Sequence, residues 1–129
     1  MRILVADDEP TCRGIYEEVL KSEGHDVVAA EEGIGALGRV NSKEEFDLLI
    51  FDEEMPNLSG PALLEIIRQK GITTPAILIG SDVDRQGADK LHQNFARVCK
   101  KPIPARLLIA LVREMLAEKN KPQKVIKGS

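Results

Sequence analysis

Short apolar runs alternate with longer amphipathic segments along the chain, and this alternation limits the possible folds more than any other feature. The runs are too short for helices and rich in Val, Ile and Leu, without a regular polar face. Such runs are typical of strands that are buried on both sides of a sheet. They cover residues 3–6, 27–30, 47–51, 76–79 and 97–99.

The segments between these runs have helical periodicity. From Cys12 to Leu20, apolar residues recur at the spacing of one helix face, and Pro10 suits the first turn of that helix. Gly24 suits its end. Four further segments have a similar pattern and predict helices: residues 34–40, 61–71, 85–95 and 107–116.

Strands that alternate with helices predict an α/β fold with a parallel sheet between two helical layers. Because crossover connections are right-handed, few topologies remain. We predict a flavodoxin-like, doubly wound five-stranded parallel sheet with strand order 2-1-3-4-5 and five helices. In this order the first and third strands are neighbours at the switch point, and ligands bind beyond their carboxyl ends.

The length of 129 residues favours one domain. We expect that domain to cover residues 1–119, followed by a basic C-terminal tail or linker stub at 120–129. No apolar run approaches the roughly 20 residues that a membrane span requires. We therefore expect no membrane contact and a cytoplasmic location, with Cys12 and Cys99 reduced.

The charges are balanced overall but unevenly distributed. There are 18 Lys and Arg against 21 Asp and Glu, a formal net charge of −3. Residues 1–60 have a net charge of −10 and residues 61–129 a net charge of +7. The nearly neutral total and an aromatic content of 3% argue against direct nucleic-acid binding.

Acidic residues follow two strands that the predicted topology makes neighbours. Asp7 and Asp8 follow the first strand, Asp52 follows the run at 47–51, and Lys101 lies just beyond the fifth strand. Carboxylates that converge in this way repel one another unless a cation intervenes, and Mg²⁺ is the first candidate. Capping of a helix alone explains an Asp-Asp pair. It does not explain acids and a lysine at the ends of three strands.

These residues lie in motifs that resemble the receiver domain of two-component response regulators, including single-domain members like the chemotaxis regulator. The first motif is Ile-Leu-Val-Ala-Asp-Asp-Glu at residues 3–9. The second is Asp-Glu-Glu-Met-Pro-Asn-Leu-Ser-Gly at residues 52–60, and the third is Lys101-Pro102. The resemblance extends from residue 2 to about residue 118.

The resemblance implies a function for each matching residue. Asp52 is expected to accept a phosphoryl group from phosphohistidine on a sensor histidine kinase or phosphotransfer protein, which gives an aspartyl phosphate. Mg²⁺ is expected to bind Asp8 directly, Asp7 through water, Asp52, and the backbone carbonyl of Glu54. Lys101 is expected to pair with the phosphoryl oxygens and to precede a cis peptide bond. Such a domain is a phosphoacceptor that catalyses its own phosphorylation and dephosphorylation, rather than an enzyme acting on a diffusible substrate.

The chain departs from the family pattern at the residues that usually respond to phosphorylation. Gly80 occupies the position of the usual Thr or Ser, and Val98 occupies that of the usual aromatic residue. In one interpretation, Ser81 supplies the missing hydroxyl, because Gly80 permits a shift of the loop. In the other, the chain is a degenerate receiver, a protein-interaction module that does not depend on phosphorylation. We favour phosphorylation because every residue that its chemistry requires is present.

Two other classes of protein fit less well. A small Mg²⁺ phosphatase usually carries Asp-x-Asp after the first strand, and a flavodoxin needs a phosphate-binding loop there. Basic residues gather between positions 85 and 101, which in the family belongs to the output face of helix 4, strand 5 and helix 5. We expect an unknown downstream protein to bind there, although a solvated helix is the alternative. The residues are Arg85, Lys90, Arg97, Lys100 and Lys101.

Overall fold

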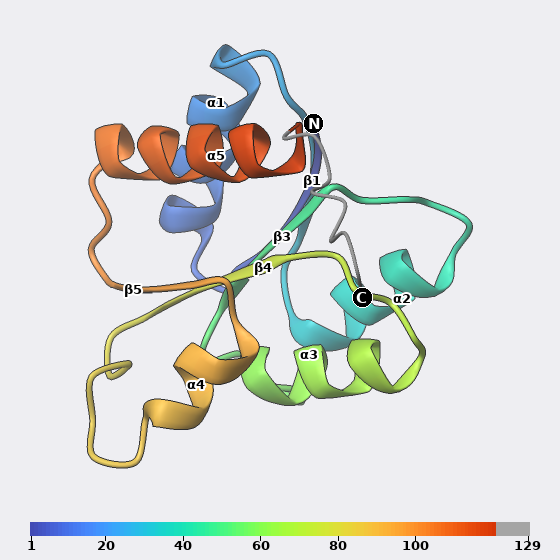
Figure 1. Cartoon of the computed structure of the whole chain (residues 1–129), viewed down its shortest axis with the longest axis vertical. Helices are drawn as coiled ribbons and strands as arrows, with labels where there is room; N and C mark the ends of the chain where they lie inside the picture. The colour runs from blue at the N-terminus through green and yellow to red at the C-terminus, as the bar shows by residue number, and fades with distance from the viewer. Residues whose placement is uncertain (121–129) are drawn as a thin grey trace, which may run out of the picture.

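The computed structural model describes residues 1–120, which form one parallel sheet between two helical layers (Figure 1). Its strand order is β2-β1-β3-β4-β5, so the predicted doubly wound topology is confirmed. The predicted tail lies outside the described residues, apart from Asn120. The strands are β1 (Arg2–Ala6), β2 (Asp26–Ala30), β3 (Leu48–Asp52), β4 (Ala76–Gly80) and β5 (Arg97–Lys100).

The helices divide between the two faces of the sheet (Figure 1). α1 and α5 cover one face, and α2, α3 and α4 cover the other. Within residues 1–120, no helix is both long enough and apolar enough to cross a membrane. The helices are α1 (Pro10–Ser22), α2 (Gly33–Asn41), α3 (Gly60–Gln69), α4 (Asp89–Asn94) and α5 (Ala105–Lys119).

The central strands are buried on both faces, as the unbroken apolar runs predict. On β3, Leu48 and Ile50 pack with α1 and α5, whereas Leu49 and Phe51 pack with α2 and α3. All four are at most 1% exposed. Because side chains alternate along a strand, each strand contributes to both halves of the core. This packing fixes the height at which every strand ends, and therefore where the residues after it lie.

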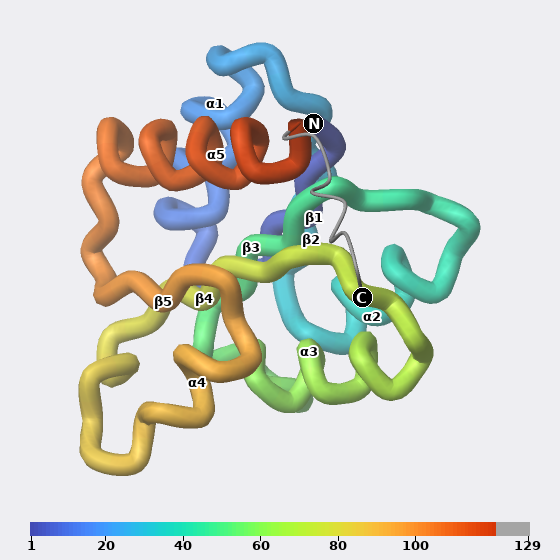
Figure 2. Tube along the Cα trace, viewed as in Figure 1, coloured from blue at the N-terminus to red at the C-terminus, as the bar shows by residue number. Residues whose placement is uncertain are grey.

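The helix predicted at residues 85–95 is wrong at its start, because α4 begins only at Asp89. Residues 81–88 instead form turns, in which Gly87 has φ of 84°. A left-handed residue of this kind interrupts helical geometry. In Figure 2 this yellow and orange segment extends well away from the sheet before it returns to α4.

Gly60 brings α3 close to the end of β3. Its N–H donates to the carbonyl of Glu53 at 3.0 Å, and the Ser59 hydroxyl accepts from the N–H of Ala62 at 3.3 Å. A Cβ atom on Gly60 would lie 2.3 Å from the carbonyl oxygen of Asp52. Only glycine therefore permits this approach of α3 to the acidic end of β3.

We expect Gly60→Ala to lower the free energy of unfolding by about 1–3 kcal/mol, because backbone must move to admit the methyl group. Gly38→Ala, within α2, is the matched control. A Cβ atom there meets nothing within 4 Å, so we expect the free energy of unfolding to rise by up to about 1 kcal/mol. Urea unfolding of both variants measures the difference. Equal stability of the two would show that the close contact at Gly60 is easily relieved.

Candidate functional site

Three carboxylates meet at the carboxyl ends of β1 and β3. Asp7 and Asp8 follow β1, and Asp52 is the last residue of β3, which pairs directly with β1. One oxygen from each carboxylate lies within 4.8 Å of the others. Asp7 is 1% exposed and Asp52 is 7% exposed, whereas Asp8 faces solvent. The sheet therefore brings together the three acids that the sequence predicts.

Lys101 brings positive charge into the same crevice from the end of β5. Its Nζ lies 3.0 Å from Asp7 Oδ2 and 3.3 Å from Asp52 Oδ1. Its backbone N–H donates to the carbonyl of Gly80 at 2.9 Å, and the Lys101–Pro102 bond is cis, as expected. The lysine thus bridges the two buried acids across the sheet.

Asp7 has acceptor capacity that the protein leaves unused. Its Oδ1 accepts from the N–H of Glu9 at 2.9 Å. Its Oδ2 is buried and forms the ion pair with Lys101, but within residues 1–120 it has no hydrogen bond of good geometry. Three carboxylates face one ammonium group, so negative charge is in excess. Hard oxygen ligands with this excess charge fit a divalent cation such as Mg²⁺.

The site holds Asp52 in an environment that disfavours its ionised form. Burial and the neighbouring charge of Asp7 raise the pKa of Asp52 to about 7, although Lys101 opposes the shift. Burial also disfavours the charged form of Lys101. The close ion pair with Asp7 and the charge of Asp52 outweigh that effect, so the pKa of Lys101 is raised.

Two predicted participants lie at the margin of the crevice. Glu54 is exposed, and within the described part of the chain its carbonyl accepts no hydrogen bond, which leaves it available as a ligand. Ser81 is exposed in the turn after β4. Its assignment as a switch hydroxyl stays a prediction, as does the metal assignment of Glu54. Val98 is half-buried on β5.

An ion pair between a buried acid and an exposed arginine, beside the crevice, was not predicted. Glu53, which follows Asp52, is 5% exposed and its Oε2 accepts from Nη1 of Arg85. Glu53 continues the alternation of Leu49 and Phe51, which places it on a buried face of β3. A buried carboxylate needs a hydrogen-bond or ionic partner, so the buried register of Glu53 was the sequence signal for this ion pair. The identity of that partner depends on the turns at 81–88.

The basic cluster predicted on the output face has fewer free charges than the sequence suggests. Lys101 turns into the crevice and Arg85 pairs with Glu53. Arg97 contacts Glu118 at 2.9 Å, and Lys100 contacts Asp84 at 3.2 Å. The interpretation of this segment as a basic surface therefore needs correction, because acids from both halves of the chain neutralise much of it.

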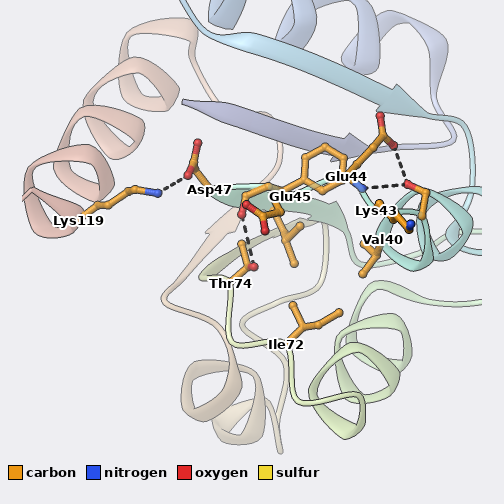
Figure 3. Close-up of a pocket in the computed structure, with 11 residues that line it drawn as sticks. Val40, Lys43, Glu44, Glu45, Asp47, Ile72, Thr74 and Lys119 are labelled. Carbon is orange, nitrogen blue, oxygen red and sulfur yellow. Dashed lines mark hydrogen bonds and ion pairs between the residues drawn. The ribbon is translucent and has the colours of Figure 1, made fainter.

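A separate groove of about 660 Å³ lies near the start of β3 and the end of α5 (Figure 3). Lys119 pairs with Asp47 on one side, and the Ser42 hydroxyl contacts Glu44 at 3.1 Å on another. Apolar Val40 and Ile72 line the space between them. This groove lies at the amino end of the sheet, away from the three carboxylates. Among residues 1–120, the acids that converge closely enough to hold a metal ion are Asp7, Asp8 and Asp52.

Fold and crevice together define a class of domain: a doubly wound α/β protein whose switch point gathers three carboxylates and a lysine. Residues 3–113 match the response regulator receiver domain. The chain belongs to this family of two-component signalling domains.

Curated relatives share this domain within much longer proteins. The sensor histidine kinase RcsC of Escherichia coli K12 is 42% identical over 77 residues, which are 60% of this chain and 8% of RcsC. The response regulator protein FleR of Pseudomonas aeruginosa is 33% identical over 113 residues, which are 86% of this chain and 24% of FleR. The chain therefore spans less than a quarter of either relative.

Solved receiver domains have the same architecture. The Francisella response regulator 1452 receiver domain superposes with a TM-score of 0.84 at 28% identity, covering 92% of this chain and 98% of that one. The response regulator TrrA of Thermotoga maritima, solved in complex with Mg²⁺ and BeF, gives a TM-score of 0.78 at 32% identity. That match covers 88% of this chain and 97% of TrrA.

The raised pKa of Asp52 predicts a pH-dependent cost to stability in the absence of metal. Between about pH 4 and pH 7 the folded state retains a proton on Asp52 that the unfolded chain releases, so stability falls as pH rises through this range. At pH 8 in EDTA, we expect the free energy of unfolding of Asp52→Asn to exceed that of the wild type by about 1–3 kcal/mol. The difference should disappear near pH 4.

Urea titrations of both proteins across pH measure this difference, and the same titrations with Mg²⁺ provide the control. Added Mg²⁺ should stabilise the wild type more than Asp52→Asn. A constant difference between the two proteins from pH 4 to pH 8 would contradict the assigned cause.

Proposed function

We propose that the chain accepts a phosphoryl group on Asp52 from phosphohistidine of a sensor histidine kinase or phosphotransfer protein, in a reaction that depends on Mg²⁺. The observation that carries this proposal is the geometry of Lys101. Its ammonium group lies 3.3 Å from Asp52 and 3.0 Å from Asp7, where three carboxylates converge. An acid, a fixed cation and spare metal ligands at one point are the requirements of phosphoryl transfer.

The residues around Asp52 fit a divalent cation. Asp8, Asp52 and the carbonyl of Glu54 would hold Mg²⁺ directly, and Asp7 would contact it through water. The unused acceptor capacity of Asp7 Oδ2 supports this assignment. Bound Mg²⁺ would neutralise charge on the phosphoryl oxygens. The structure of TrrA with Mg²⁺ and BeF provides a precedent in a relative that is 32% identical.

In the proposed step, a carboxylate oxygen of Asp52 attacks phosphorus and forms the acyl phosphate bond. The bond between phosphorus and the histidine nitrogen breaks, and its electron pair stays on that nitrogen. Lys101 then has a phosphoryl oxygen within reach, and its ammonium group stabilises the charge on the equatorial oxygens. Water later attacks phosphorus and releases inorganic phosphate, which restores Asp52. In this proposal the chain is a phosphoacceptor that catalyses its own turnover.

The proposed output is contact with a downstream protein on the face of α4, β5 and α5. Arg97 and Lys100 are paired with acids in the unphosphorylated structure. Acidic groups of a partner could compete for these exposed cations, since surface ion pairs contribute little individually.

Phosphorylation by acetyl phosphate tests the proposal directly. With Mg²⁺ present, we expect the intact mass to increase by one phosphoryl group, because the small donor replaces the kinase. Asp52→Asn should abolish the increase, and EDTA should suppress it. Mass spectrometry of the intact chain makes the measurement.

The degenerate receiver predicts a different outcome. In that case the wild type would show no increase in mass and no binding of beryllofluoride. Turnover of a phosphomonoester well beyond one equivalent would instead support a phosphatase. Either result would reject the proposed function.

Lys101→Ala tests the proposed electrostatic role, and Lys100→Ala is the matched control. We expect Lys101→Ala to slow phosphorylation by acetyl phosphate at least about tenfold, because a preorganised charge is lost. Lys100 is exposed and paired with Asp84, so its removal should change the rate little. Time courses of intact mass at fixed Mg²⁺ compare the two variants. Similar rates for both would exclude a specific role for Lys101.

A further inference from the structure

The space beside Gly80, at the end of β4, is already occupied. A Cβ atom built on Gly80 would lie 2.7 Å from Cβ of Glu53 and 3.0 Å from its Oε1. It would also lie 2.9 Å from Cγ1 of Val83. A threonine or serine at this position could not be accommodated without movement. The side chain of Glu53, at the end of β3, therefore fills the space that a side chain at position 80, at the end of β4, would occupy.

Glu53 is a buried carboxylate whose partner belongs to the segment after β4. Arg85 Nη1 donates to Oε2 of Glu53 and also to the carbonyl of Asp82 at 2.7 Å. Glu53 is 5% exposed, whereas Arg85 lies largely in solvent. One guanidinium group thus ties the residue after the acceptor to the turns at 81–88.

This contact is placed where phosphorylation changes the charge. Asp52 and Glu53 are consecutive, although their side chains alternate between the two faces of the strand. A phosphoryl group on Asp52 would add negative charge and new acceptor oxygens one residue away from Glu53, and Arg85 would have to leave Glu53 to reach them. Like charges repel in such a site, and Arg binds phosphoryl oxygens through two parallel hydrogen bonds. Glu53 and Arg85 also line an open surface hollow of about 410 Å³, which leaves Arg85 room to move.

We propose that Glu53 and Arg85 form the phosphorylation-sensitive contact of this domain, in which the phosphoryl group on Asp52 competes with Glu53 for the Arg85 guanidinium. Arg85 is then a phosphoryl-binding residue of the phosphorylated form, and its movement displaces residues 81–88. This inference rests on the proposed function of Asp52. It assigns to an ion pair the response that a hydroxyl at Gly80 would otherwise provide.

The turns at 81–88 connect this contact to α4. Val83 and Ala88 are buried, and Leu91 of α4 packs in the same core cluster. Val83 and Ala88 lie on either side of Arg85 in the sequence, so a displacement of Arg85 would shift these buried side chains against α4. The intervening turns contain Gly87 in a left-handed conformation, and Figure 2 shows the segment standing clear of the sheet.

Beryllofluoride with Mg²⁺, added to the 129-residue chain, tests the contact by NMR. In the wild type we expect shifts of the Arg85 side-chain Nε–H signal and of the backbone amides of residues 81–88. Arg85→Met should weaken beryllofluoride binding roughly fivefold and remove the 81–88 response even at saturation. Arg85→Lys should restore part of the affinity without the full response, because lysine lacks the planar fork.

Glu53→Gln tests the competition. Without its charge, Glu53 no longer holds Arg85, so we expect beryllofluoride to bind more tightly and the free protein to have 81–88 signals already displaced toward the bound positions. Arg113→Met is the matched control, since Arg113 forms an exposed pair with Glu23 at 2.7 Å, on α5 and away from the crevice. It should behave as the wild type. Urea unfolding of each variant confirms that it is folded.

The outcomes separate this inference from the function on which it rests. An 81–88 response that persists in Arg85→Met at saturation would overturn it while leaving phosphorylation of Asp52 intact. A response lost in Ser81→Ala but kept in Arg85→Met would assign the contact to the serine instead. A wild type that neither gains mass with acetyl phosphate nor binds beryllofluoride would reject both proposals.

Discussion

Repulsion among carboxylates at the carboxyl ends of β1 and β3 is the constraint on which this structure depends. Asp7 and Asp52 are nearly inaccessible to solvent, so water cannot screen them well. Lys101, which enters from the end of β5, offsets part of this repulsion. Burial and the remaining charge of Asp7 raise the pKa of Asp52 to about 7. The apolar strands hold these charges in place, because moving one acid would require moving a strand that is buried on both faces.

The same constraint explains how much could be predicted from the sequence. Strand order follows from the alternation of strands and helices and from the handedness of crossovers, and it places Asp7, Asp52 and Lys101 at one edge of the sheet. Residues next to a strand end inherit their position from the strand. The predicted positions of these residues depend on little else, whereas the cis bond after Lys101 was predicted from the resemblance to receiver domains.

The contact between Glu53 and Arg85 could not be predicted in this way. Their separation is 32 residues, and Arg85 belongs to turns that the sequence suggested were helical. Periodicity identifies which face of an element is buried, but it does not specify the path of a segment such as 81–88. The register of β3 does indicate that Glu53 is buried. The choice of Arg85 over other nearby cations depends on local turn geometry, including Gly87.

This arrangement accounts for only part of the uneven charge of the two halves of the chain. The acidic half contributes Asp7, Asp8 and Asp52 to one crevice, and the basic half contributes Lys101. A second pair crosses between the halves when Arg85 reaches Glu53. Two cations of the basic half thus offset the negative charge of acids at the ends of β1 and β3. They differ in exposure, because Lys101 is fixed between two buried carboxylates, whereas Arg85 extends into solvent. A charge added at Asp52 would therefore act on both cations, but only the one on the exposed, turn-rich segment could respond by moving.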